Sequence, residues 1–161
     1  MEEKEIIKLP IKEIIELGYC PTCLNRKYHG AIYGDDSLTK LYQDEDIEVI
    51  LVSNPRSRGH IAIISTEHYK NMLEAPDKLN IKMVECSKFL MNELVKIYGC
   101  ETVYLCTMCD GKMNHYHVQL IPRYKDEDIG SKNFVKPRKQ YVYEEDKFLL
   151  LKESLISFYK K

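Results

Sequence analysis

The chain has 161 residues, of which 44% are hydrophobic and 30% are charged, and this balance indicates a globular protein rather than a disordered one. Its formal net charge of −1 gives no electrostatic reason to expect a nucleic acid or a membrane as partner. No apolar run approaches the ~20 residues needed to cross a bilayer, and the acidic first residues lack the layout of a signal peptide. We therefore expect one domain over residues 1–161, in the cytoplasm.

The first 28 residues are expected to form an N-terminal segment with a short amphipathic piece and a C-x-x-C motif, Cys20 to Cys23. Strand-like runs follow, in which β-branched and apolar residues lie between turn residues. The expected strands are 29–34, 38–43, 46–53, 60–65, 102–108 and 115–121. Pro122 is expected to stop the last of them.

Apolar residues at steps of three and four predict two longer helices. The first runs from Asp77, as its N-cap, to about Tyr98 and is ended by Gly99. The second covers 144–159, and the polar stretch 125–140 between them is expected to be irregular. The buried faces are expected to hold Met83, Cys86, Leu90, Leu94 and Ile97 in the first helix and Phe148, Leu151, Leu155 and Phe158 in the second. These elements predict an α+β fold, an antiparallel five- to six-stranded sheet with two helices on one face.

One predicted strand carries polar side chains suited to phosphate chemistry. Side chains alternate across a strand, so His115, His117 and Gln119 share one face, while the other face is apolar and suits a core. An imidazole nitrogen is nucleophilic near neutral pH, because the ordinary pKa of histidine is ~6.5. It can attack phosphorus when its other nitrogen is held as a donor. Gln119 can donate to a phosphoryl oxygen but cannot deliver a proton. We therefore predict a phosphate-chemistry site on this face of the strand.

At this point the sequence resembles a known family. The run from His115 to Arg123, His-Tyr-His-Val-Gln-Leu-Ile-Pro-Arg, looks like the signature of the histidine-triad (HIT) superfamily of nucleotide hydrolases and transferases. Residues 59–68 look like its upstream strand, and Cys20 to Cys23 lies where zinc-containing members carry a C-x-x-C motif. The resemblance covers about residues 18 to 124. It implies a HIT-like fold, a nucleotide or nucleotide sugar as small-molecule partner, and a covalent nucleotidyl-histidine intermediate on His117, with a homodimer as one assembly state.

The chain departs from the family pattern in its third triad position. Most hydrolytic members have a histidine where this chain has Gln119, and a glutamine there is similar to galactose-1-phosphate uridylyltransferase and to the diadenosine-polyphosphate phosphorylases. Gln119 therefore favours transfer or phosphorolysis of a nucleoside phosphoanhydride or phosphoester. The alternatives are a HIT-type hydrolase of dinucleoside polyphosphates or nucleoside phosphoramidates, and a non-catalytic, zinc-stabilised nucleotide-binding protein.

The substrate-binding residues are expected beside the triad. Many members hold the ribose with an aspartate eight residues before the Gly-His histidine, and here that position is Val52. Ser53 or Asn54 is the candidate replacement. Lys112 and Asn114 lie in the loop that leads into the triad strand, which borders the phosphate in the family, so both are candidate phosphate contacts.

Two C-x-x-C pairs indicate metal binding or packing, since nothing in the sequence suggests export to an oxidising compartment. The first pair can supply two thiolates to a tetrahedral zinc. By the resemblance, the full set of ligands would be Cys20, Cys23, His68 and His115, a closed and therefore structural zinc site. The alternative is a four-thiolate site that adds the second pair, Cys106 and Cys109. It is disfavoured because the former lies on a predicted strand and the latter at the following turn, so both thiols could not easily share a face.

Overall fold

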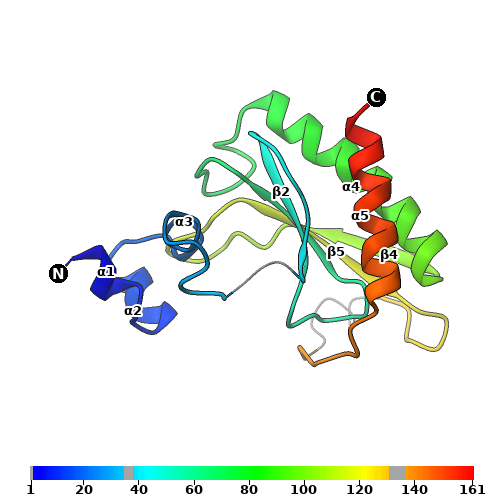
Figure 1. Cartoon of the computed structure of the whole chain (residues 1–161), viewed down its shortest axis with the longest axis horizontal. Coiled ribbons are helices and arrows are strands. Elements are labelled where there is room, and N and C mark those ends of the chain that lie inside the picture. Colours follow the sequence, from blue (N-terminus) through cyan, green and yellow to red (C-terminus); the bar gives the residue numbers. More distant parts are fainter. Residues whose placement is uncertain (1, 35–37, 131–136) are drawn as a thin grey trace.

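The computed structural model describes residues 2–34, 38–130 and 137–161. Its strands form one antiparallel sheet in the order β1-β2-β3-β5-β4, which confirms the predicted α+β class (Figure 1). The strands are β1 (Lys40–Gln43), β2 (Ile47–Leu51), β3 (Ile61–Ser65), β4 (Thr102–Cys106) and β5 (His117–Arg123). The helices are α1 (Glu3–Ile6), α2 (Ile11–Glu16), α3 (Pro21–Lys27), α4 (Asp77–Tyr98) and α5 (Glu145–Tyr159).

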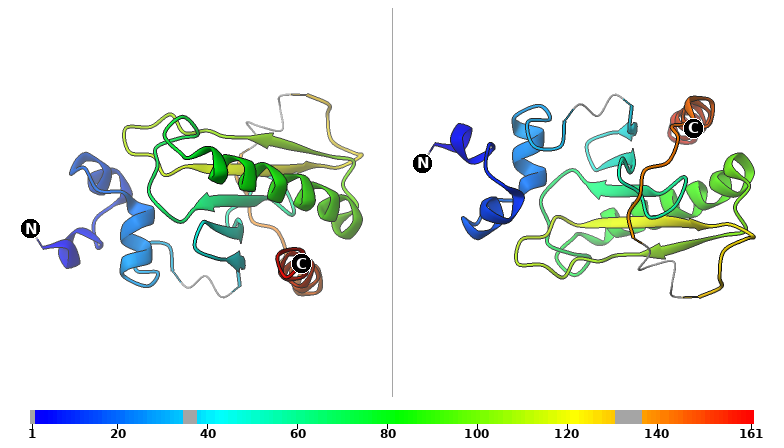
Figure 2. Two further views of the ribbon diagram at one scale, coloured as in Figure 1. Left: turned by 90° about the horizontal axis from the view of Figure 1, so that it is seen from above. Right: turned by 90° about the horizontal axis from the view of Figure 1, so that it is seen from below.

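One face of the sheet is the core face, and α4 lies across it (Figure 2, left). Val118 and Leu120 point into this core from β5, as the alternation of the sequence predicts. The other long helix, α5, packs against α4 and against the edge strand β1. Of the predicted apolar faces, Met83, Cys86, Leu90, Leu94, Phe148, Leu151 and Leu155 are buried, and Ile97 and Phe158 are partly buried. The N-cap of α4 is Pro76, one residue before the predicted Asp77, and Gly99 ends the helix at a φ of 68°.

The opposite face of the sheet, called the site face below, carries the polar residues of the predicted active site. The strand register aligns Glu48 of β2 with Ile64 of β3, and Ile64 in turn with His117 of β5. The next row on the same face joins Ile50, Ala62, Gln119 and Cys106. Gln119 therefore has a paired strand on each side, β3 and β4, and His117 is paired with β3, so these ladders fix the backbone of both residues.

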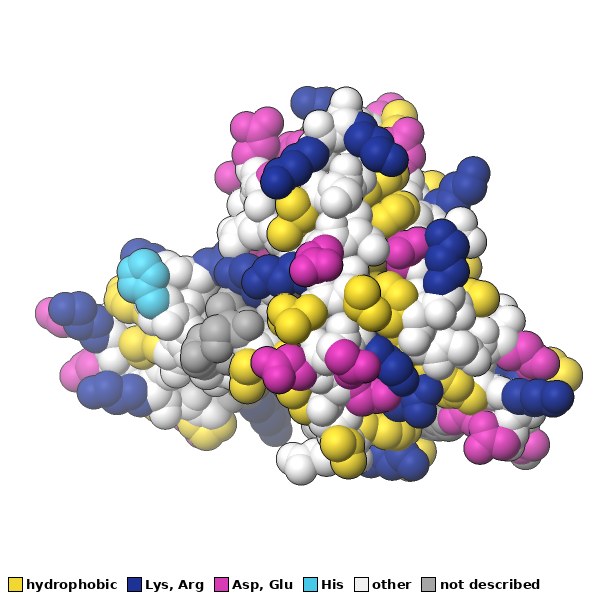
Figure 3. Space-filling view, turned by 45° about the vertical axis from the view of Figure 1, so that its right-hand side comes forward, with side chains coloured by type: hydrophobic (Ala, Val, Ile, Leu, Met, Phe, Trp, Pro, Cys, Tyr) yellow, Lys and Arg dark blue, Asp and Glu magenta, His cyan; other side chains and the backbone are white. Residues whose placement is uncertain are grey.

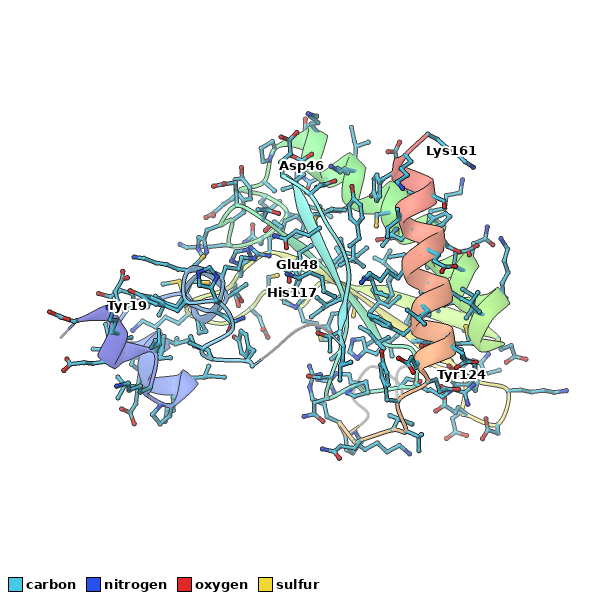
Figure 4. The ribbon with its side chains drawn as sticks, viewed as in Figure 1. Tyr19, Asp46, Glu48, His117, Tyr124 and Lys161 are labelled. Atoms are coloured by element: carbon cyan, nitrogen blue, oxygen red, sulfur yellow. The ribbon has the colours of Figure 1, made fainter. Side chains whose placement is uncertain are left out.

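The three N-terminal helices form a small unit at one end of the molecule (Figure 1). They bury their own apolar cluster, which is built around Ile6, Ile14 and Leu24. Arg26 of α3 joins this unit to the sheet. Its Nε and Nη2 donate to Glu48 Oε2 at 2.9 and 2.8 Å, and its Nη1 donates to the carbonyl oxygens of residues 65 and 66 at 2.9 and 2.7 Å. Figure 4 shows Glu48 close to His117. Because Arg26 binds Glu48, α3 covers this end of the site face.

Three local predictions are wrong. The predicted strand 115–121 begins only at His117, so His115 lies just before β5 and not on its face, because the N–H of residue 116 bonds to the carbonyl oxygen of residue 69 instead of to a neighbouring strand. Residues 29–34 form turns instead of a strand, because the Asn25 side-chain oxygen accepts the backbone N–H groups of Ile32 and Tyr33 at 3.0 and 2.9 Å. Those N–H groups are thereby engaged in a local turn rather than a ladder. Pro122 does not stop β5, since it pairs with Val103 of β4. Pairing with β3 ends at Leu120, so the missing N–H of the proline interrupts no bond to that strand.

None of the described helices is long and apolar enough to cross a membrane. Lys and Arg side chains are interspersed with Asp and Glu over the face drawn in Figure 3, in keeping with the net charge of −1.

Candidate active site and metal centre

His117 stands at the start of β5 with both ring nitrogens engaged. Its Nδ1 lies 2.8 Å from the backbone carbonyl oxygen of His115, and its Nε2 lies 3.3 Å from Gln119 Nε2. A carbonyl oxygen can only accept, so Nδ1 carries the proton and donates it. The lone pair is therefore on Nε2, on the site face and beside the carboxamide of Gln119. This is the protonation state that nucleophilic attack by the imidazole requires.

A second buried histidine holds that carboxamide. His60 Nε2 lies 2.9 Å from Gln119 Oε1, and His60 Nδ1 accepts the backbone N–H of Arg56 at 3.1 Å. The backbone N–H can only donate, so Nδ1 is the acceptor and Nε2–H donates to the amide oxygen. The amide NH₂ of Gln119 must then face His117. We call this chain of hydrogen bonds the relay; it runs from Arg56 N–H through His60, Gln119 and His117 to the carbonyl oxygen of His115.

The local fold explains why His60 stays neutral. It follows Gly59, whose φ of 79° suits glycine, and a Cβ at that residue would lie 3.2 Å from the Tyr98 ring. The His60 side chain is fully buried, and this burial lowers its pKa to about 4. At neutral pH the imidazole is therefore uncharged, as its two roles in the relay demand.

A cluster of sulfur and nitrogen donor atoms lies around His115, two residues before His117. The ligand atoms of Cys20, Cys23, His68 and His115 all lie within 4.8 Å of one another, so the structure brings the whole predicted metal set together. Cys20 Sγ lies 3.5 Å from His115 Nδ1, and Cys23 Sγ lies 3.5 Å from the Nδ1 atoms of both His68 and His115. Zinc bonds of ~2.3 Å to sulfur and ~2.05 Å to nitrogen place such atoms about 3.6 Å apart in a tetrahedron. The donor types and the spacing therefore fit a tetrahedral metal ion such as zinc.

The hydrogen bonds around the cluster favour the binding of a cation. His115 is buried and its Nε2 lies 2.7 Å from the carbonyl oxygen of Ser65, which leaves Nδ1 as the free donor atom. Hydrogen bonding to Cys23, and then to His115, lowers the pKa of Cys20, whereas the hydrogen bond to Cys20 raises the pKa of Cys23. The pair thus shares one proton, and a divalent cation would supply the charge that lets both thiols ionise.

The other predicted site residues lie around the triad without joining the relay. Ser53 and Asn54 are exposed in the loop between β2 and β3, and Val52 donates its N–H to the carbonyl oxygen of His60 at 2.9 Å. Lys112 is exposed. Asn114 bonds to the backbone of Gly111 through both ends of its amide, at 3.0 and 2.7 Å, and so shapes the loop that precedes the triad strand.

The second C-x-x-C pair lies outside the metal cluster that the described residues form. Cys106 is on β4 beside Gln119, and Cys109 Sγ lies 3.8 Å from His117 Nδ1. The two pairs therefore do not make the four-thiolate site.

Sequence reasoning assigned no role to two residues that matter here. Arg26, three residues after Cys23, fastens α3 to the sheet, and nothing local in the sequence points to its partner Glu48. His60 was visible only as part of a Gly-His pair. Its function depends on a contact with Gln119, 59 residues away.

A family model, the HIT domain, matches residues 35–126. The chain belongs to the HIT family. Within this family, the chain is 31% identical over 99 residues to an uncharacterized HIT-like protein of Borreliella burgdorferi, a match that covers 58% of this chain and 71% of that protein. It is 32% identical over 96 residues to an adenylylsulfatase of Arabidopsis thaliana, over 57% of this chain and 49% of that one.

Solved structures show the same HIT fold. A Zn-bound histidine triad family protein from Mycobacterium smegmatis matches with a TM-score of 0.60 and 17% identity, over 75% of this chain and 86% of that chain. The Plasmodium falciparum diadenosine triphosphate hydrolase matches with a TM-score of 0.58 and 17% identity, over 78% and 82%. The family match begins at residue 35 and ends at residue 126, so the N-terminal unit and α5 both lie outside it.

Proposed function

We propose that this HIT protein transfers a nucleotidyl group from a nucleoside phosphoanhydride or phosphoester, to phosphate or to water, through a covalent intermediate on His117. The observation that carries the proposal is the relay. A backbone donor at one end and a backbone carbonyl at the other give every hydrogen bond in it one direction, and this direction leaves a lone pair on His117 Nε2.

The reaction follows from that lone pair. His117 Nε2 attacks the α-phosphorus, and the bond from phosphorus to the bridging oxygen breaks. The bridging oxygen leaves as an anion with the bonding electrons, while Nδ1–H, held by the His115 carbonyl, stabilises the charge on the phosphorylated ring. An acceptor oxygen then attacks phosphorus and releases His117, and if the acceptor is water, its proton passes to solvent.

Gln119 shapes the choice of substrate in this proposal. Its NH₂ can turn from His117 Nε2 to a phosphoryl oxygen and stabilise the developing charge, but it has no proton to give to a leaving group. A leaving group that departs as a stable anion is therefore favoured over an amine. Two named relatives, the adenylylsulfatase and the diadenosine triphosphate hydrolase, have names that fit an anionic leaving group.

We further propose that Cys20, Cys23, His68 and His115 hold a structural zinc ion. The closed donor set and the Zn-bound relative support this assignment. When bound, zinc would supply positive charge that keeps both thiols ionised and fixes the His115 ring. The chain's own residues carry out the transfer.

The test is to trap the intermediate. The protein is incubated with α-labelled nucleoside polyphosphates and nucleotide sugars, quenched in alkali, and analysed for label on the chain. His117→Ala should carry no label, and the matched variant His29→Ala, at an exposed histidine outside the site, should carry the wild-type amount. Label retained in His117→Ala would refute the mechanism. Adding phosphate or water to the isolated intermediate then distinguishes a transferase or phosphorylase from a hydrolase, and nucleotide binding without label would favour the binding-protein alternative.

A further inference from the structure

The segment that leads into α5 returns to the active site. We call residues 137–144 the C-terminal strap; it lies on the side of the sheet opposite α4 (Figure 2, right). Lys139 N–H donates to the carbonyl oxygen of Pro55 at 3.1 Å, and Arg138 Nη1 donates to the carbonyl oxygen of Asn54 at 2.7 Å. The strap is therefore fastened to the loop whose Arg56 N–H begins the relay. It lies beyond residue 126, where the family match ends.

Arg138 lies beside the loop that carries Arg56, because its Nη1 bonds to the carbonyl oxygen of Asn54, two residues before Arg56. Burial, and then the charge of Arg56, lowers the pKa of Arg138. Burial, and then the charges of Arg138 and Arg56, lowers the pKa of His60. Burial raises the pKa of the Cys106 thiol, and the charge of Arg56 opposes this rise; Cys106 is the β4 neighbour of Gln119 on the site face. The Arg56 N–H bonds to His60 and Arg138 Nη1 bonds to Asn54, so both arginines lie at the His60 and Gln119 end of the relay, while α3 and the metal cluster lie at the other end.

Two like charges side by side repel one another, and an anion between them would relieve the repulsion. In the described part of the chain, no ion pair with a carboxylate involves Arg138. Guanidinium groups bind phosphate oxygens through paired, charge-assisted hydrogen bonds. Gln119 Nε2 lies 3.3 Å from His117 Nε2, so a group bound beside Gln119 would also lie beside the phosphorus that His117 would attack.

We propose that Arg56 and Arg138 form a subsite for the phosphate group next to the one attacked, either the departing phosphate of a polyphosphate or an acceptor phosphate. The inference rests on the proposed function and extends it to a substrate class, nucleoside polyphosphates. Gln119 cannot protonate a leaving oxygen, so the negative charge that the oxygen gains must be stabilised by cations. The two arginines supply this positive charge, and the relay holds His117, the nucleophile, beside it.

The test compares two substrates on matched variants. Labelling of His117 is measured with α-labelled ATP, which loses pyrophosphate, and with α-labelled adenosine 5′-phosphoramidate, whose nitrogen is protonated by solvent and leaves as neutral ammonia. Arg138→Gln should lower kcat/KM for ATP by about 10- to 100-fold, the effect of losing hydrogen bonds between charged groups. It should leave the phosphoramidate reaction within about twofold. Lys139→Gln removes an equal charge from the next residue of the strap, whose side chain lies over the Tyr141 ring, and should leave both reactions unchanged.

The two possible sources of the phosphate are separated by the step affected. Slower labelling in Arg138→Gln assigns the subsite to the departing phosphate, and slower discharge of preformed intermediate by inorganic phosphate, with unchanged discharge by water, assigns it to the acceptor. If Arg138→Gln behaves as wild type in both steps, or if it slows both substrates equally, the subsite is refuted. If wild type forms no intermediate at all, the proposed function fails, and calorimetric binding of pyrophosphate decides the subsite alone. In that case binding weakened in Arg138→Gln but not in Lys139→Gln supports the subsite, and equal binding overturns it.

Discussion

The neutral, buried state of His60 predicts a specific dependence of stability on pH. The folded pKa of His60 is about 4, against an ordinary value of 6.5. Well above pH 6.5 the residue is uncharged in both states and contributes no pH dependence. As the pH falls below 6.5, the unfolded chain takes up a proton that the folded chain rejects until about pH 4, so the free energy of unfolding falls.

The size of this loss follows from the two pKa values. A pKa difference of one corresponds to about 1.36 kcal/mol, so the change from 6.5 to about 4 is worth roughly 3 kcal/mol. The side chain is fully buried, so solvent screening does not reduce the figure as it would at the surface. This loss should develop between pH 6.5 and pH 4 and remain constant below.

The assay is urea unfolding followed by circular dichroism at several values between pH 7 and pH 4. His60→Gln keeps an acceptor and a donor but cannot titrate, so its free energy of unfolding should fall by roughly 3 kcal/mol less than that of the wild type over this range. The exposed His29→Gln is the matched control and should follow the wild type. Acid would also protonate the ligands of the proposed zinc site in all three proteins, so the difference between curves is the measured quantity. Parallel curves for wild type and His60→Gln would refute the neutral, buried assignment.

Three further predictions concern the metal, the core and the turn before β3. Elemental analysis should show zinc lost in His68→Ala and retained in Cys106→Ser; equal zinc in both would contradict the ligand set. Leu94→Ala should cost about 2–5 kcal/mol in urea unfolding because that side chain is fully buried, whereas Leu105→Ala, 47% exposed, should cost less than about 1 kcal/mol. Gly59→Ala should lower the melting temperature and slow the labelling of His117, since the residue has a φ of 79° and its Cβ would press on Tyr98. A wild-type melting temperature and labelling rate would contradict the requirement for glycine at this turn.

The sequence could predict the features that depend on local periodicity. His117 and Gln119 share a face because strand side chains alternate, and the buried stripe of α4 follows from helical spacing. The metal set came from a different source. Nothing in the spacing of Cys23 and His68 brings them together, and only the resemblance to a family suggested it.

The remaining features depend on contacts between distant segments, which local patterns do not encode. The turns at 29–34 form because the Asn25 side chain bonds to Ile32 and Tyr33, a contact that competes successfully with their strand propensity. The docking of α3 depends on Arg26 meeting Glu48 across the site face. The direction of the relay depends on a single backbone N–H in a loop, and no side-chain pattern reports where such a group points.

His115 links the two halves of the site. Its ring contributes Nδ1 to the donor cluster while its Nε2 bonds to Ser65, and its own backbone carbonyl accepts the Nδ1–H of His117 at 2.8 Å. A metal ion bound here would fix this ring and therefore also the carbonyl acceptor that sets the tautomer of His117. At the far end of the relay, the N–H of Arg56 sets the direction of the hydrogen bonds through His60 and Gln119. Because both ends are backbone groups with one possible role each, rotation of a single side chain cannot reverse the relay. The lone pair of His117 thus keeps its position between the N-terminal unit and the C-terminal strap, two segments that lie outside the matched HIT domain.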